Sequence, residues 1–281
     1  MRKSARILSI YVLIYTVQAE KFCNIHSDYI TGQCYKKEIL ASIPHSPNQL
    51  AVDRTSNVLY FSFDSGMGEY VPGKLKIGNN TLFVLKGIRD AFAIASDFAT
   101  GDLYFGGSHG IYKYNPGLRS LKRLAVQNLD IWWLVIRRKI YFIKFPSLSA
   151  FKYENRSIRY VEQLRNHTVH QFVFDNEDNI YFINNTGLFG INSGSMEAHL
   201  LKDHPKFIGM ARDNYGYVYL CSEDGIFVIR KMHKIKRVIG IQGVLGLTFD
   251  RNNNIIYSDS SEIVRLVAKE KIKIAYNYDE I

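Results

Sequence analysis

The sequence lacks several features that mark common protein classes. Its 281 residues include only three cysteines and six prolines. So few cysteines exclude a small scaffold held by many disulfides. No apolar run reaches the ~20 residues that a membrane-spanning helix needs, and no His-Glu-x-x-His metal motif occurs. These absences argue against the small disulfide-rich, membrane-spanning and zinc-protease classes and favour an ordinary globular fold.

The residues that are abundant favour β-structure. Aromatic residues make up 14% of the chain, with 19 Tyr and 17 Phe, and these side chains suit half-buried strands. With 47% hydrophobic and 22% charged residues, the chain can bury a core and is not a disordered segment. Closed all-β folds commonly run to about 200–250 residues as one unit. The composition therefore predicts one all-β domain.

The N-terminus has the pattern of a signal peptide. Arg2, Lys3 and Arg6 precede an apolar stretch from Ile7 to Val17, and a small residue, Ala19, follows. The stretch is too short for a membrane anchor, so we expect cleavage after residue 19 and a secreted protein. The formal net charge of +10 could attract acidic polysaccharide, a membrane surface or an anionic small ligand. Secretion makes nucleic acid the least suitable partner, and no membrane span is expected.

Secretion also gives the cysteines and sequons a context. In an oxidising compartment we expect Cys23 to pair with Cys34 and tie down an N-terminal arm over residues 20–44. Cys221 lies in a strand pattern and is expected to be a buried free thiol, with a mixed disulfide as the alternative. Possible glycosylation sites are Asn79, Asn155, Asn166 and Asn184, each in an Asn-x-Ser/Thr sequon,.

One motif recurs along the chain: an apolar strand ending in Asp, a polar turn, then an aliphatic residue followed by Tyr. Its copies are QLAVDRTSNVLYFS (49–62), AIASDFATGDLYFG (93–106), WLVIRRKIYFIK (133–144), QFVFDNEDNIYFIN (171–184), GMARDNYGYVYLCS (209–222) and GLTFDRNNNIIYSD (246–259). In the third copy the turn is shorter and Arg137 replaces the Asp. The tyrosines recur about every 40 residues, which is the period of propeller blades.

Each copy continues with two more segments of strand character. Four antiparallel strands in each of six copies predict a six-bladed β-propeller over residues 45–281. Two segments compete for the outer edge of the last blade, residues 37–42 (KEILAS) and 271–276 (KIKIAY). The sequence does not decide between them.

The first strand of each blade is expected to line the central channel, and alternation sorts its side chains. The third position before the turn Asp is large and apolar, so it should pack between blades, whereas the second is small, as a crowded axis requires. The fourth position is uneven: it holds Gln49, Ala93, Trp133, Gln171, Gly209 and Gly246. That unevenness could leave a pocket beneath Trp133, or the indole could plug the axis as core.

Aromatic and polar residues gather near the same channel entrance, as in many small-molecule sites. The predicted ligand-binding residues are Gln49, Phe92, Trp132, Trp133, His170, Gln171 and Phe207. Asp90 and Asp130 are the only carboxylates expected near this entrance. Hard cations need several oxygen ligands including carboxylates, so we predict no metal, no cofactor and no catalytic residue.

The repeats resemble the YWTD/SMP-30/NHL group of six-bladed propellers. The phrases PNQLAVD (47–53), NVLYFSF (57–63) and ASDFATGDLYFGGSHGIYKYN (95–115), with the signal sequence and early cysteines, look similar to insect ommochrome-binding proteins. The resemblance covers residues 20–281 and assigns no individual contacts. It implies a haemolymph carrier of phenoxazinone pigments, whose ligand is planar, aromatic and acidic. Such a ligand suits a basic protein with aromatic residues at a channel mouth.

Two other function classes stay open. A metal-dependent lactonase or esterase of the SMP-30 type shares this architecture, and so does a propeller that binds other proteins outside the cell. Receptor propellers of the second kind sit among other modules, whereas this chain holds a propeller alone. We therefore expect a monomeric, extracellular pigment carrier and not an enzyme.

Overall fold

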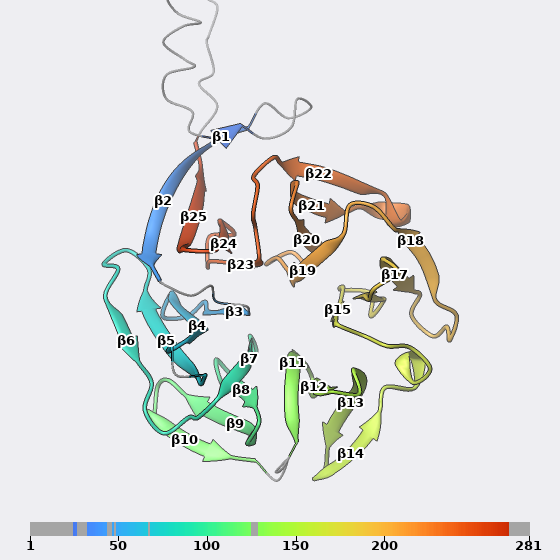
Figure 1. Ribbon diagram of the computed structural model, residues 1–281, viewed down its shortest axis with the longest axis horizontal. Helices are drawn as coiled ribbons and strands as arrows, with labels where there is room; N and C mark the ends of the chain where they lie inside the picture. Colours follow the sequence, from blue (N-terminus) through green and yellow to red (C-terminus); the bar gives the residue numbers. More distant parts are fainter. Residues whose placement is uncertain are drawn as a thin grey trace, which may run out of the picture.

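A computed structural model describes residues 25–26, 33–43, 47, 49–66, 68–124 and 129–269. Its strands form six sheets arranged in a ring around a central axis (Figure 1). The predicted six-bladed β-propeller with four antiparallel strands per blade is therefore confirmed. The signal segment at residues 1–19 and the predicted disulfide partner Cys23 lie outside the described residues.

In each blade the first strand lies innermost and the fourth lies on the rim (Figure 1). The first three blades are β3 (Leu50–Asp53), β4 (Val58–Asp64), β5 (Tyr70–Lys76) and β6 (Leu82–Val84); β7 (Ala91–Ser96), β8 (Leu103–Gly107), β9 (Gly110–Asn115) and β10 (Ser120–Arg123); and β11 (Asp130–Arg137), β12 (Lys139–Phe145), β13 (Ser149–Glu154) and β14 (Ser157–Tyr160). The last three are β15 (Gln171–Phe174), β16 (Ile180–Ile183), β17 (Leu188–Ile191) and β18 (His199–Lys202); β19 (Phe207–Arg212), β20 (Val218–Ser222), β21 (Gly225–Ile229) and β22 (Ile235–Ile239); and β23 (Gly246–Phe249), β24 (Ile255–Ser258), β25 (Glu262–Ala268) and β2 (Cys34–Ser42), with β1 (Ile25–His26) beyond it. Two short 3-10 turns, η1 (Glu162–Leu164) and η2 (Lys231–His233), are the only helical segments in these ranges.

Large apolar side chains of the inner strands fill the space between blades, as predicted. The residues three positions before the turn are all buried, with 0–6% of their surface exposed: Leu50, Ile94, Leu134, Phe172, Met210 and Leu247. The second strands add the repeated tyrosines; Tyr60, for example, packs edge-on against Phe105 of the next blade, with ring centroids 6.3 Å apart. Burial of these apolar and aromatic surfaces between neighbouring blades is the main force that holds the ring together.

The repeated Asp closes the hairpin between the first two strands of a blade. In five blades its Oδ1 accepts the backbone N–H two residues on, at 2.9–3.0 Å: Asp53, Asp97, Asp175, Asp213 and Asp250. This Asx-turn satisfies a backbone donor that the strands leave unpaired. In the third blade Arg137 cannot accept such a bond, and Arg138 makes the shorter turn with a φ of 56°.

The N-terminal strand β2 closes the ring. It pairs antiparallel with β25, with Ile39 opposite Val264, and becomes the fourth strand of the last blade. Lys37 Nζ lies 3.1 Å from a carboxylate oxygen of Glu262 across this pair. The first of the two competing segments, residues 37–42, therefore occupies the outer edge, and residues 271–276 lie outside the described part.

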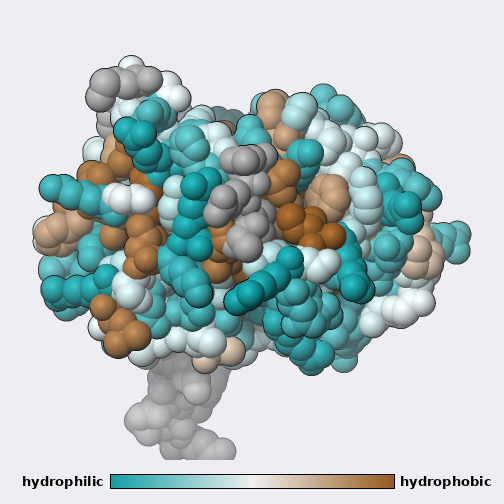
Figure 2. Space-filling model, turned by 90° about the horizontal axis from the view of Figure 1, so that it is seen from below, coloured by the Kyte–Doolittle hydropathy of each residue, from teal (hydrophilic) through white to brown (hydrophobic). Residues whose placement is uncertain are grey.

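The rim that Figure 2 shows is largely hydrophilic. Hydrophobic side chains appear there as separate patches (Figure 2). Exposed apolar side chains of the outer strands include Phe83 of β6 and Ile158 of β14. Single exposed apolar residues are normal on soluble domains. No helix in the described residues is long and apolar enough to cross a membrane.

Candidate functional site

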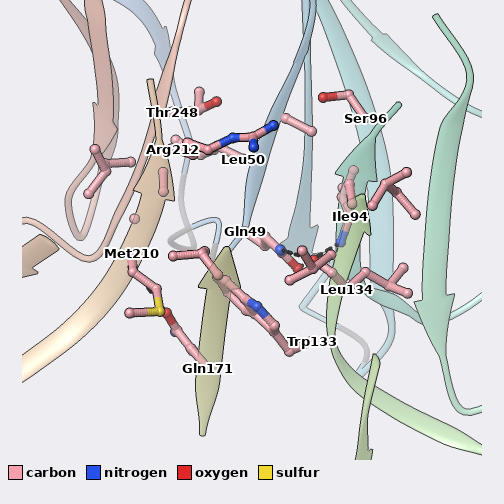
Figure 3. A pocket seen from close by; sticks show the side chains of 18 of the residues that line it. Gln49, Leu50, Ile94, Ser96, Trp133, Leu134, Gln171, Met210, Arg212 and Thr248 are labelled. Carbon is pink, nitrogen blue, oxygen red and sulfur yellow. Dashed lines mark hydrogen bonds between the residues drawn. The ribbon is translucent and has the colours of Figure 1, made fainter. Parts of the chain in front are cut away.

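A cavity of about 110 Å³ lies in the central channel, and the inner strands of all six blades line it. The small residues two positions before the turn all belong to its wall, as predicted: Ala51, Ala95, Val135, Val173, Ala211 and Thr248. Figure 3 shows two ends of this cavity. Gln49, Trp133 and Gln171 lie toward one end, and Ser96, Arg212 and Thr248 lie toward the other.

The first end, here called the amide end, is defined by Gln49, Trp133 and Gln171. Gln49 accepts the backbone N–H of Ile94 at 2.9 Å and donates to the Leu134 carbonyl at 3.0 Å. Gln171 likewise accepts the backbone N–H of Met210 at 3.1 Å, and its Nε2 donates to a carbonyl of the same strand, β19. Gln49 thus binds the inner strands of the second and third blades, and Gln171 binds that of the fifth.

Trp133 performs a similar role in the third blade. Its indole Nε1 donates to the carbonyl of Phe172 in β15 at 2.9 Å, and only 6% of the residue is exposed. The inner edge of every blade presents backbone groups without a strand partner, and buried groups of this kind need hydrogen bonds. Gln49, Trp133 and Gln171 supply them, so these polar atoms are already committed to the fold.

An aromatic row lies next to the amide end. It consists of Tyr70, Phe92, Trp132 and Phe145. Phe92 stacks on Trp132 with centroids 4.5 Å apart, Tyr70 meets Phe92 edge-on at 4.9 Å, and Phe145 lies 5.9 Å from Trp132. Phe92 and Trp132 are each partly exposed. The row is outside the cavity wall.

Two carboxylates accompany the aromatic row. Asp130 begins β11, and Asp90 precedes β7 with a φ of 46°. Partial burial, and then the charge of Asp90, raise the pKa of Asp130 above its usual range. This mouth therefore carries two negative charges that repel each other, and they disfavour a ligand carboxylate beside them.

Two further predicted contacts, His170 and Phe207, are also outside the cavity wall. Phe207 is 7% exposed and packs edge-on against Phe227, with centroids 5.4 Å apart. The backbone N–H of His170 donates to Ile183, and partial burial lowers the pKa of its imidazole. Of the predicted ligand-binding residues, Gln49, Trp133 and Gln171 thus line the cavity, and Phe92 and Trp132 stack on each other beside it.

The opposite end, here called the arginine end, is defined by Arg54, Arg137 and Arg212. Arg137 and Arg212 line the cavity together with Phe98. Arg54 lies over the Phe98 ring, with its Cζ 3.5 Å from the centroid. Burial lowers the pKa of Arg212, and the charge of Arg137 lowers it further. Three cations therefore converge where the inner strands end.

Sequence reasoning missed this end for an identifiable reason. Arg212 stands one position before the turn Asp, on the side of the strand that alternation assigns to the space between blades. That side also reaches the channel, however: Ser96 and Arg212 line the cavity, as do Ile94 and Met210 two residues earlier. An available signal was chemical: the corresponding residues elsewhere are Val52, Ser96, Ile136, Phe174 and Phe249, so Arg212 is the charged exception.

Two larger grooves lie between neighbouring blades on the hairpin-turn face. One of about 770 Å³ runs beside Tyr181, Tyr215 and Arg230, and one of about 510 Å³ beside Tyr60, Lys74 and Phe83. Each involves the turns of only two blades. The channel cavity draws on all six inner strands, so we take it as the candidate site.

Two possible nucleophiles have unsuitable surroundings. Cys221 is fully buried and free, as predicted, and burial raises the pKa of its thiol to about 12. A thiol in this state is a poor nucleophile. Ser108 lies in a Gly-x-Ser-x-Gly sequence, residues 106–110, but this sequence joins β8 to β9 in a hairpin. A hydrolase elbow instead joins a strand to a helix.

The predicted glycosylation sites lie at the surface. Asn79, Asn155 and Asn166 are exposed, and Asn184 is partly exposed. The Oδ1 of Asn184 accepts the backbone N–H of Thr186 at 2.8 Å. All four sites, like the Cys23–Cys34 disulfide, stay predictions.

The channel residues do not fit a divalent metal. Metals such as calcium take six to eight oxygen ligands, including carboxylates. At the amide end the available oxygens are those of Gln49 and Gln171, and both already accept backbone N–H groups. Across the described ranges, no group of three His, Cys, Asp or Glu side chains is placed to hold a metal ion.

Comparison with known proteins gives one sequence relative and many structural ones. No family model matches the chain. An ommochrome-binding protein of Manduca sexta is 26% identical over 251 residues, which cover 86% of this chain and 91% of that protein.

Several solved structures share the fold. A putative gluconolactonase has a TM-score of 0.68 at 11% identity, covering 88% of this chain and 94% of its own. A gluconolactonase of Xanthomonas campestris has a TM-score of 0.69 at 13% identity, covering 87% and 94%. Regucalcin of Agrobacterium tumefaciens, a calcium-binding protein, has a TM-score of 0.62 at 8% identity, covering 84% and 96%. These identities are too low to carry more than the fold.

Proposed function

We propose that the protein is an extracellular carrier that binds a planar, acidic aromatic pigment of the ommochrome type at its central channel. The observation that carries the proposal is the match to the Manduca sexta ommochrome-binding protein, which extends over 91% of that protein. The proposed location outside the cell rests on the predicted signal peptide.

The channel has the composition of a small-molecule site. Its wall combines aromatic side chains, Phe98, Trp133 and Phe174, with aliphatic ones and two arginines. Ligand sites are usually apolar concavities with a few polar groups that fix the orientation of the ligand. A basic chain, with a net charge of +10, also favours an acidic ligand at long range.

The size of the cavity bears on how a pigment would bind. At about 110 Å³ it is smaller than the ~300–1,000 Å³ of sites that enclose a drug-sized ligand. We therefore propose that one end of the pigment enters the channel while its ring system lies at a mouth. The stacked Phe92 and Trp132 offer a face for this ring system, with Gln49, Trp133 and Gln171 as the wall beyond it.

Intrinsic fluorescence gives a direct test because the chain has only two tryptophans, and Trp132 and Trp133 are adjacent. Titration of the full chain with xanthommatin should quench the tryptophan emission saturably, with one pigment bound per chain. Trp132→Ala should weaken pigment binding, and pigment absorbance that coelutes with the protein would measure it. Phe83→Ala, at an exposed aromatic of the outer strand β6, is the matched control. A protein that neither coelutes with the pigment nor shows quenching contradicts the proposal.

A lactonase is the alternative that the structural relatives favour, because two of them are gluconolactonases. Their metal-dependent chemistry needs a donor set that the channel residues described above do not provide. Metal analysis of purified protein, combined with an assay of gluconolactone hydrolysis, separates the two functions. Stoichiometric calcium or zinc together with turnover would favour the enzyme.

A further inference from the structure

Arg212 occupies an unusual position at the end of β19. Its guanidinium points into the channel between Ser96 and Thr248 (Figure 3). Within the described residues its side chain forms no hydrogen bond and no ion pair. Other partly buried arginines have such partners: Arg265 pairs with Glu38, and Arg137 pairs with Asp178. A guanidinium with five donors and no acceptor is therefore presented to the cavity.

Arg54 adds a second uncompensated cation. It stacks on Phe98, and its Nε is buried without a hydrogen-bond partner. Burial, and then the charge of Arg212, lower the pKa of Arg54 to about 10. An arginine normally keeps its proton far above this pH. Arg54 and Arg212 are therefore both partly buried cations without an ion-pair partner among the described residues.

The carboxylates whose charge acts on Arg212 are those of Asp175, Asp213 and Asp178, and each is engaged elsewhere. The Oδ1 of Asp213 accepts the backbone N–H groups of Tyr215 and Tyr217, each at 2.9 Å, and its Oδ2 accepts the side chain of Asn253. Asp175 is similarly engaged within its own turn, and Asp178 pairs with Arg137. The hairpin turns and Arg137 therefore use the carboxylates that could otherwise pair with Arg54 and Arg212.

We propose that the arginine end is an anion site that binds the carboxylate of a small aromatic acid, with Arg212 as its main ligand. The planar guanidinium matches a carboxylate with two parallel hydrogen bonds. The hydroxyls of Ser96 and Thr248 line the same end of the cavity. Phe98 is 45% exposed and covered on one side by Arg54, and it supplies an aromatic surface beside the bound carboxylate,. The inference rests on the proposed function only for the identity of the natural acid.

The probe for this site is benzene-1,3-dicarboxylate, titrated into the full chain by calorimetry at low salt. We expect saturable binding that weakens as sodium chloride is added, because the attraction is electrostatic. The neutral diamide of the same ring should not bind. Arg212→Gln should raise the dissociation constant of the dicarboxylate at least tenfold, and Arg212→Lys should raise it by less.

Arg251→Gln is the matched control. This exposed arginine lies on the neighbouring hairpin turn and does not line the cavity, so its loss removes one charge without touching the site. Binding that is equal in wild type and in Arg212→Gln, or an equal loss in both variants, overturns the proposal. Should Arg212→Gln fail to fold, the salt dependence and the Arg212→Lys variant decide.

The two proposals can fail separately. If xanthommatin binds but the dicarboxylate does not, and Arg212→Gln keeps full pigment affinity, the anion site is wrong and the carrier function stands. If the dicarboxylate binds through Arg212 but xanthommatin does not, the anion site stands and the pigment function is wrong.

Discussion

At the amide end of the channel, both polar atoms of the Gln49 and Gln171 side chains bind backbone groups of other blades. At the arginine end, Arg212 lines the same cavity without a hydrogen bond from any described residue, and Arg54 Nε is buried without a partner. The comparison separates polar side chains that hydrogen-bond one blade to another from polar side chains that make no hydrogen bond to the described residues of the ring. Residues of the second kind are the better candidates for ligand binding, because their hydrogen-bonding capacity is unused.

The largest expected effect is at the amide end. Trp133→Ala removes a large buried side chain and leaves the Phe172 carbonyl unpaired, so we expect a loss of about 3–5 kcal/mol in the free energy of unfolding. Trp133→Phe keeps most of the packing and should cost about 1–2 kcal/mol. Urea denaturation measures both. Trp132→Ala is the comparison variant. An equal loss of unfolding free energy in that variant would contradict the distinction between Trp133 in the cavity wall and Trp132 outside it.

The second test concerns Gln171. Its replacement by alanine leaves two backbone groups of β19 unpaired, so the free energy of unfolding should fall by about 1–3 kcal/mol. Gln163→Ala is a suitable control because that side chain forms no hydrogen bond within the described residues. If Gln171→Ala is as mild as the control, the amide is not a blade-to-blade link.

The third test concerns the arginine end, where we expect loss of a polar side chain not to destabilise the fold. Arg212→Leu removes a partly buried cation without a partner, and we expect stability to stay level or to rise by up to about 1 kcal/mol. Arg137→Leu should instead lower stability by up to about 1 kcal/mol, because Arg137 pairs with Asp178 in the next blade,. A large loss from Arg212→Leu would show that the fold, and not a ligand, uses this guanidinium.

The smallest effect concerns the charge of Asp130, beside the amide end. The raised pKa of Asp130 means that the folded state holds its proton more tightly than the unfolded state does. The wild type therefore loses stability as the pH rises through this pKa. Asp130→Asn should stabilise the protein slightly at pH 7, by less than about 0.5 kcal/mol, and the difference should vanish in acid. Asp203→Asn, at an exposed position, is the control variant.

Most of the fold could be predicted because each blade repeats its own local chemistry. The turn Asp recurs because it forms the Asx-turn, and the strand Tyr recurs because it packs between blades. Six imperfect copies of the same motif make the repeat recognisable. Ring closure could not be predicted, because residues 37–42 and 271–276 have the same strand character. Which of them pairs with β25 depends on contacts between the two ends of the chain.

The site could be predicted only in part. Alternation correctly placed Gln49, Trp133 and Gln171 at the channel, but their partners are backbone atoms of other blades, which have no signature in the sequence. Arg212 was not predicted, because alternation assigns its side of the strand to the space between blades, whereas that side also lines the cavity. The sequence also does not show that Arg212 lacks a neutralising partner within the described part of the chain, because this depends on the hydrogen bonds of Asp213 within its own turn.

The pairing of β2 with β25 has a consequence for biosynthesis. β2 precedes all the other blade strands along the chain, and β25 is the last described strand. β2 is therefore translated long before its partner. Until then β2 has an unpaired edge, and the first strands of the ring have no blade on one side. Contacts of such long sequence separation fold slowly, and open strand edges favour aggregation. A chain truncated before residue 262 should therefore remain an open ring that aggregates more readily than the full chain.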